Sequence, residues 1–192
     1  MEHYTDLSRI VHGHRFFSSG RGSDQVTQEI PDIIQYQQIV AFDLAGQVYG
    51  IDIARVYEII RMESLTAIPR APEFVEGVIN LRGQIIPVID LRKRFGLPKA
   101  EQTRSSRIII VEMNEMRVGL TVDAVLEVLD LGVGTINPPP PVVQGGVDSA
   151  FLQGIALVKE RLVVLLAVDS ILIKKERDAL KKAGRELETT TG

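Results

Sequence analysis

Two stretches of this chain align with each other without a gap, and no other feature of the sequence restricts the fold as much. The segment QIVAFDLAGQVYGIDIARVYEII, residues 38–60, matches RIIIVEMNEMRVGLTVDAVLEVL, residues 107–129. Gly50 falls on Gly119, and most apolar positions of the two segments coincide. Self-similarity of this kind indicates one structural unit that is used twice.

A second pair of matching segments follows in the same order. Residues 74–90, FVEGVINLRGQIIPVID, match residues 151–169, FLQGIALVKERLVVLLAVD, with two extra residues in the later copy. Both segments begin with Phe-x-x-Gly and end in aspartate. The sequence therefore predicts two copies of one design, at about 36–98 and 106–173.

The hydrophobic pattern within each copy is typical of short strands, because apolar residues mostly alternate with polar or small ones. Ala45–Gln47 and Asn80–Gly83 predict hairpin turns, and Gly83 supplies the positive φ that the second turn needs. Apolar residues at helical spacing across residues 53–60 predict a short helical turn after the second strand. Pro87 predicts a strand that lies at a sheet edge or carries a bulge.

About five short strands in each copy would leave exposed sheet edges, and closure into a barrel removes such edges. We therefore expect an all-β fold with a few short helices. Two pseudo-symmetric five-stranded β-barrels would pack around a shared apolar core and be intertwined by the chain ends. Together they would form one domain over residues 36–173.

The two ends of the chain and one internal segment differ from this body. Residues 1–35 are rich in serine, glycine, arginine, histidine and aspartate without a sustained period, which predicts a flexible N-terminal tail. Residues 174–192 predict a charged helical tail that frays into solvent. The proline run and glycines of Ile136–Gly146 predict an extended surface loop.

Composition argues against several classes of function. A net charge of −3 and few aromatic residues disfavour a protein that neutralises phosphates or stacks bases. Cysteine is absent, and His3, His12 and His14 all lie in the predicted tail, so we expect no enzyme, no metal site and no cofactor. Neither a secretory signal nor an apolar run of about 18 residues is present, so we expect a cytoplasmic protein.

Carboxylates offer the one route to catalysis, since a pair of them can hydrolyse a glycoside. The candidates are Asp52, Glu58, Asp90, Asp123, Glu127 and Asp169. Solvated strand ends and helix caps explain them better, and Asp90 and Asp169 both have the sequence context of N-caps. A small carboxylate-dependent hydrolase and an oligonucleotide-binding barrel are therefore the alternatives, the latter requiring a basic, aromatic face that the sequence does not show.

Surface recognition is the function that the remaining residues favour, because a groove between two barrels can bind a partner helix. Val56 and Glu58 would lie on the predicted helical segment, near Gly77 and Arg82 of the following hairpin. Gly77 would let a partner's backbone approach, and Arg82 offers a planar fork of donors to carboxylates or helix-end carbonyls. Each residue also has an interpretation that involves no partner. Val56 could be a core residue and Glu58 a cap or a local ion pair. Gly77 could mark a bulge and Arg82 could be a solvated side chain.

Divergence between the copies supports a contact at the Arg82 turn. The segment Asn80–Gly83 reads NLRG, whereas its counterpart Leu157–Glu160 reads LVKE. Such a difference is expected if one copy acquired a specific contact.

Three motifs resemble the bacterial chemotaxis coupling protein family, CheW, over residues 39–173. They are YGIDIARVYEII, IPRAPEFVEGVINLRGQIIPVIDLRKRFG and RVGLTVDAVLEVL, in the expected order and spacing. The resemblance implies two SH3-like five-stranded barrels around a shared core. It also implies a non-catalytic adaptor that couples the regulatory domain of the histidine kinase CheA to the cytoplasmic hairpin tips of chemoreceptors. Such a protein contacts no nucleic acid and meets the membrane only through receptors.

The resemblance also implies which residues bind the receptor or the kinase, because individual positions of this sequence match the family's binding positions. The candidate partner-binding residues are Val56, Glu58, Gly77, Asn80, Arg82, Ile108 and Val128. A long leading tail and the run Pro138–Pro141 depart from the family pattern. The chain's 192 residues leave no room for a receiver or ATP-binding domain, so we expect a stand-alone coupler.

Overall fold

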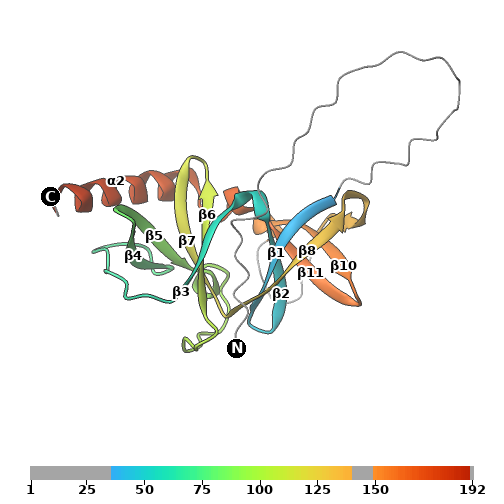
Figure 1. The fold of residues 1–192 in the computed structure, drawn as a ribbon. Coiled ribbons are helices and arrows are strands. Elements are labelled where there is room, and N and C mark those ends of the chain that lie inside the picture. Colours follow the sequence, from blue (N-terminus) through green and yellow to red (C-terminus); the bar gives the residue numbers. More distant parts are fainter. Residues whose placement is uncertain (1–35, 140–148, 191–192) are drawn as a thin grey trace, which may run out of the picture. The chain divides into compact units, whose positions relative to one another are not determined.

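The computed structural model describes residues 36–139 and 149–190, which belong to one compact unit (Figure 1). The predicted tail of residues 1–35 and most of the predicted loop, including Pro140 and Pro141, lie outside the described residues. The described part is mostly strand, as predicted, with short helical turns and one longer helix.

Two sheets contain the strands. The first sheet uses β1 (Tyr36–Leu44), β2 (Gln47–Asp52), β8 (Ala124–Gly132), β9 (Ile136–Asn137), β10 (Leu152–Val158) and β11 (Arg161–Leu166). Its six strands have the order β8-β1-β2-β11-β10-β9. The second sheet uses β3 (Val56–Arg61), β4 (Val75–Leu81), β5 (Gln84–Asp90), β6 (Arg107–Met113) and β7 (Met116–Val122). Its five strands have the order β3-β6-β7-β5-β4.

Each sheet takes strands from both sequence copies, which differs from the expectation that residues 36–98 and 106–173 each form a module. The five-stranded sheet joins β3, β4 and β5 of the first copy to the β6–β7 hairpin of the second. The copies pair through two antiparallel ladders, β1–β8 and β3–β6, and through two parallel contacts. At the parallel contacts Val88–Asp90 pairs with Gly119–Thr121 and Val163–Leu165 pairs with Val48–Gly50. A repeat in the sequence reveals the unit but not which copy pairs with which, so the exchange could not be predicted.

The duplicated glycines lie at these parallel contacts. A Cβ atom at Gly50 would lie 2.8 Å from Cδ1 of Ile39, and one at Gly119 would lie 2.8 Å from Cγ2 of Ile108. Ile39 and Ile108 belong to separate apolar clusters, one associated with each sheet. The glycines therefore leave room for the side chains that fill these two clusters.

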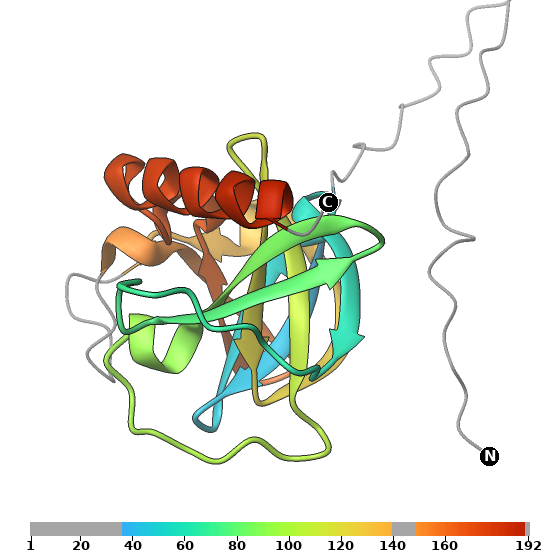
Figure 2. The ribbon, with the colours of Figure 1, turned by 90° about the vertical axis from the view of Figure 1, so that its left-hand side faces the viewer.

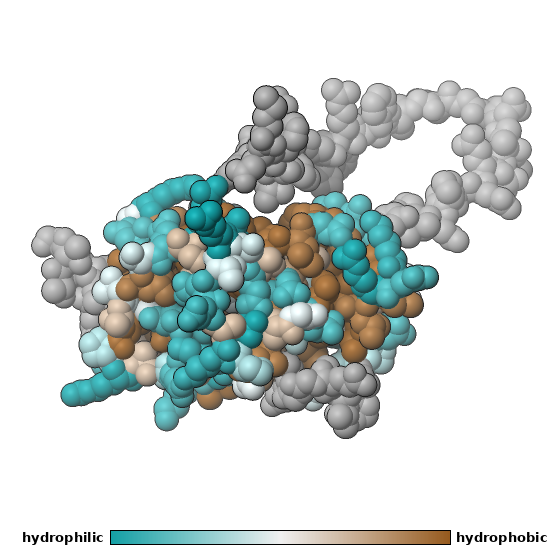
Figure 3. All heavy atoms as spheres, turned by 90° about the horizontal axis from the view of Figure 1, so that it is seen from below, coloured by the Kyte–Doolittle hydropathy of each residue, from teal (hydrophilic) through white to brown (hydrophobic). Residues whose placement is uncertain are grey.

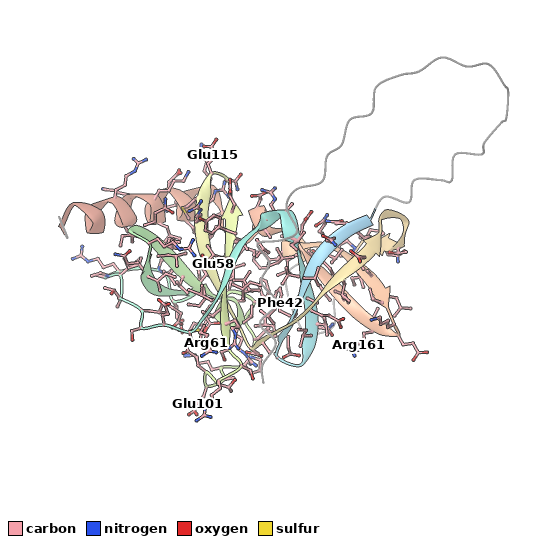
Figure 4. All side chains as sticks on the ribbon, viewed as in Figure 1. Phe42, Glu58, Arg61, Glu101, Glu115 and Arg161 are labelled. Atoms are coloured by element: carbon pink, nitrogen blue, oxygen red, sulfur yellow. The ribbon has the colours of Figure 1, made fainter. Side chains whose placement is uncertain are left out.

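A third and larger cluster confirms the predicted shared core, since it draws buried residues from both sheets. Within it the rings of Phe42, Tyr49, Phe95 and Phe151 follow one another, with centroids 5.2–6.1 Å apart. Buried aromatic rings at such distances gain packing energy beyond their buried area. Phe42 lies between the two sheets in Figure 4.

The short helical turn predicted after the second strand is present, but it ends at Arg55, so Val56 and Glu58 lie on a strand and not on the helical segment as expected. A single 3-10 turn, η2 (Ile53–Arg55), begins where the Asp52 carboxylate accepts the Ala54 N–H at 2.9 Å, and β3 follows at once. The strand register shifts between Val56 and Glu58. Such a bulge adds one residue to the alternation, which imitates helical spacing in the sequence.

The turn predicted at Ala45–Gln47 is confirmed, with positive φ at Ala45 and Gly46. The proline prediction is wrong, because β5 lies between β7 and β4 and the bulge in its ladder with β4 falls between Val75 and Gly77. Pro87 pairs with Val78 of β4, and the pairing of β5 with β7 begins only at the following residue. Pro87 thus lies where β5 lacks a ladder to β7, as a residue without an N–H requires.

One of the two predicted N-caps is confirmed and the other is wrong. Asp90 caps α1 (Leu91–Arg94) and accepts the Lys93 N–H at 3.2 Å. Asp169 instead lies inside η5 (Val168–Ser170) and accepts from Arg55 at 2.6 Å. Strand register makes Ala167, not Asp169, the counterpart of Asp90, so the second copy carries no insertion before this point.

The C-terminal helix packs on the body through its first part, where the tail was expected to fray into solvent. Helix α2 (Lys174–Thr190) lies along the green strands of the β4–β5 hairpin in Figure 2, and Leu180 is buried in the shared core. The Arg94 side chain donates two hydrogen bonds to Glu176, at 3.1 and 3.0 Å. Its guanidinium also lies against the rings of Phe74 and Phe151, which are equivalent residues of the two copies.

Candidate partner-binding site

The Arg82 turn is built from two consecutive residues with positive φ, of 52° at Arg82 and 86° at Gly83. Two-residue hairpin turns of this kind match the twist of the strands they join. The Asn80 side chain accepts the Gly83 N–H at 2.8 Å and holds the turn. The arginine side chain, 71% exposed, therefore projects from a fixed backbone.

Glu58 is the partner of this arginine within the protein. Arg82 Nη2 lies 3.0 Å from Glu58 Oε1, and the glutamate side chain is 28% exposed. Glu58 Oε2 is buried and has no hydrogen-bond partner in the part of the chain that the structure describes. Glu58, labelled in Figure 4, projects from β3, and Arg82 follows β4. The pair therefore joins the two opposite edge strands of the five-stranded sheet.

Tyr57 lies beside this pair and was not found from the sequence. It occupies the bulge in β3 and is 44% exposed. The Arg117 guanidinium carbon is 3.5 Å from the Tyr57 ring centroid, and Arg117 Nη1 donates to Gln84 Oε1 at 2.5 Å. The available signal was an aromatic residue next to the candidate Glu58 in a chain with few aromatic residues. We call Tyr57, Glu58, Asn80 and Arg82 the Arg82 surface.

Gly77 does not offer space to a partner's backbone, contrary to the sequence interpretation. It is buried, its φ is +149°, and a Cβ atom there would lie 2.4 Å from the Thr66 carbonyl oxygen. Thr66 exchanges two backbone hydrogen bonds with Val78, at 2.9 and 2.8 Å. The glycine therefore admits the chain's own backbone beside a β-bulge.

The remaining candidates occupy different places. Val56 is partly buried against the shared core. Ile108 is fully buried in the cluster of the five-stranded sheet, so a partner cannot reach it. Val128 is 41% exposed but lies on β8 in the six-stranded sheet, paired with Val40. The structure thus groups Glu58, Asn80 and Arg82 and places Val128 elsewhere.

Exposed apolar residues accompany Val128 on the six-stranded sheet. They are Leu126, Leu157 and Leu162, between 45% and 63% exposed. Seen from below, apolar surface is present on the right-hand side of the molecule, where Figure 1 places this sheet (Figure 3). The polar Arg82 surface thus belongs to the five-stranded sheet, and the exposed apolar residues belong to the six-stranded sheet.

Asp123, one of the carboxylates considered for catalysis, has a pKa below the ordinary value for aspartate. Burial raises its pKa, but hydrogen bonds from Arg92 at 2.8 and 2.5 Å and from the Ala45 N–H at 2.7 Å outweigh burial, so the net pKa falls. A general acid needs the opposite shift. Asp123 instead joins α1 to the β1–β2 turn, which fits a structural ion pair better than the hydrolase alternative.

The family model described as a CheW-like domain matches residues 38–176. The chain belongs to this family. It is 34% identical over 143 residues to chemotaxis protein CheW of Rhizobium meliloti, covering 74% of this chain and 92% of that protein. It is also 34% identical over 139 residues to chemotaxis protein CheW of Bacillus subtilis, covering 72% and 88% respectively.

A solved CheW structure extends the comparison from sequence to fold. The crystal structure of the scaffolding protein TtCheW from Thermoanaerobacter tengcongensis matches with a TM-score of 0.70 and 45% identity. The match covers 74% of this chain and 96% of that structure. The resemblance stated from the sequence motifs is confirmed. Within the described CheW-like body, no helix is long and apolar enough to cross a membrane.

Proposed function

We propose that this CheW-like chain is a non-catalytic adaptor of bacterial chemotaxis. It couples the cytoplasmic hairpin tips of chemoreceptors to the regulatory domain of the histidine kinase CheA, and it acts in the cytoplasm. The kinase performs phosphoryl transfer, and the adaptor transmits the state of the receptor by contact. Family membership and the Arg82 surface together support this role.

The Arg82–Glu58 pair is the observation that carries the proposal. Arg82 uses one side of its guanidinium for Glu58 and remains 71% exposed, so further N–H donors are available to a partner's carboxylate or helix-end carbonyl. Glu58 Oε2 is buried, so the role of Glu58 would be to orient the arginine from behind. Holding both side chains in place before binding lowers the entropy lost on association.

We further propose that Val128 belongs to a second contact surface, with Leu126, Leu157 and Leu162. An adaptor needs two surfaces to hold two partners at once, and these residues lie on the other sheet. Gly77 and Ile108, which are enclosed, would then affect binding by maintaining the fold near the Arg82 surface.

We also propose that each sheet closes into a barrel. No strand ladder among the described residues joins the first strand of either sheet to the last, so closure remains a prediction. The edge-to-edge ion pair of Glu58 and Arg82 supports closure of the five-stranded sheet. So does an apolar cluster that includes Ile60 of β3 and Ile79 of β4, the two edge strands.

Chemical-shift titration tests the assignment of partners. The isotope-labelled chain would be mixed separately with a receptor-tip fragment and with the kinase's regulatory domain. We expect one partner to shift the amide signals of Tyr57, Glu58 and Arg82 and the other to shift those around Val128. Absence of binding to both fragments would contradict the adaptor function, and overlapping shifts would contradict the two-surface assignment.

A further inference from the structure

A groove of about 490 Å³ runs between the C-terminal helix and the five-stranded sheet. Its floor contains Ile85 and Pro87 of β5, Met116 of β7 and Leu180 of α2. Met116 and Leu180 are buried, and Ile85 is partly buried. The helix therefore leaves an open groove beside the sheet.

The rim of the groove is predominantly basic. Arg117, Lys181 and Arg185 line it together with one acidic side chain, Glu115. Figure 4 shows Glu115 at the β6–β7 turn, next to α2. Lys181 reaches the Asn114 carbonyl oxygen at 3.5 Å, which holds its ammonium group at the mouth of the groove. An apolar floor with a cationic rim complements a ligand that combines apolar and carboxylate groups.

Gly184 is the second observation that points to a ligand. It lines the groove from within α2, where glycine destabilises a helix relative to alanine. A Cβ atom at this position would meet no heavy atom within 4 Å, so packing inside the protein does not require glycine here. A larger side chain would instead project into the groove. The glycine therefore keeps open a space that the fold itself does not use.

We propose that this groove binds an acidic segment of a partner protein, with an apolar side chain on the floor and a carboxylate at Lys181. The inference does not depend on the adaptor function, because it concerns a surface of the isolated chain. A protein segment is favoured because the groove is lined by helix α2 on one side and by strand β5 on the other, which suits a peptide.

The test uses two short synthetic peptides, one alternating glutamate with leucine and the other alternating lysine with leucine. Binding to the full chain is followed by the amide signals of Ile85, Leu180 and Gly184. We expect the glutamate peptide to shift these signals and the lysine peptide to leave them unchanged. Equal shifts with both peptides, or none with either, would overturn the proposal.

Two matched pairs of variants locate the site. Gly184→Met fills the groove and should abolish binding, whereas Gly184→Ala gains helix propensity without filling it and should bind normally. Lys181→Glu should weaken the glutamate peptide about tenfold, which corresponds to about 1.4 kcal/mol. Lys175→Glu makes the same charge change on α2 outside the groove and should have little effect. Equal affinities within either pair would refute the site.

Discussion

Arg82 donates to Glu58 across the two opposite edges of the five-stranded sheet, with 3.0 Å between Nη2 and Oε1. The residues lie 24 positions apart in the chain, on a turn and on an edge strand. An ion pair with a largely exposed arginine contributes little to stability, on the order of 0–1 kcal/mol. The pair therefore matters more for what it presents to a partner than for holding the fold.

Replacing Gly77 should destabilise the protein strongly. Gly77→Ala places a Cβ atom against the Thr66 carbonyl oxygen at a positive φ, so we expect a loss of about 3 kcal/mol in the free energy of unfolding. Urea denaturation measures this loss. Gly83→Ala is the control, because it also has a positive φ but meets open space, and it should cost only about 1 kcal/mol. Similar costs for both variants would show that the Thr66 contact is unimportant.

Shortening the neighbouring isoleucine to valine should restore stability to an alanine variant at Gly50 but not at Gly119. Gly50→Ala and Gly119→Ala should each cost about 1–3 kcal/mol, because each new methyl group overpacks an apolar cluster. Ile39→Val removes the Cδ1 atom that the first methyl group meets, so it should partly restore Gly50→Ala. Ile108→Val retains the Cγ2 atom that the second one meets, so it should not restore Gly119→Ala. Double-mutant cycles in denaturant measure both couplings, and equal rescue would contradict the packing described.

Asp123 should make stability depend on pH in the acid range. Its pKa is lowered in the folded protein, so its contribution is fully present above the ordinary aspartate pKa of about 3.9 and is lost as the pH falls through the lowered folded value. At neutral pH, Asp123→Asn should cost about 1–3 kcal/mol, because it weakens charge-assisted hydrogen bonds from Arg92.

Unfolding measured across the acid range checks this prediction. The stability difference between the unmodified chain and Asp123→Asn should shrink as the pH falls. Glu101→Gln, an exposed carboxylate on the loop before β6, serves as the control and should show little difference at any pH. A gap that stays constant into acid would mean that the carboxylate charge is not what holds Arg92.

The sequence was sufficient for features that depend on local pattern or self-similarity. The alignment of Gly50 with Gly119 predicted the duplication, alternation predicted the strands, and apolar content predicted a core shared by both copies. The turns at Ala45–Gln47 and Asn80–Gly83 each contain a glycine, the residue that best tolerates positive φ. The family motifs placed Glu58 and Arg82 among the candidates, and the structure brings these two into contact.

Features set by distant contacts could not be predicted. The bulge between Val56 and Glu58 gave a strand the spacing of a helix. The role of Gly77 depends on Thr66, which a sequence pattern does not connect to it. The packing of α2 involves distant contacts, such as that of Arg94 with Glu176, 82 positions later in the chain. Each error arose where tertiary pairing decided the local structure.

The central claim is that the Arg82 surface contacts a partner while contributing little to folding. Arg82→Glu tests it most directly, in an assembly of receptor fragment, kinase and this chain, with Arg104→Glu as a control on an exposed loop. We predict that Arg82→Glu retains its unfolding midpoint within error but loses most kinase activation and co-sedimentation, while Arg104→Glu behaves as the unmodified chain. Normal assembly by a folded Arg82→Glu protein, or its failure to fold, would contradict the account.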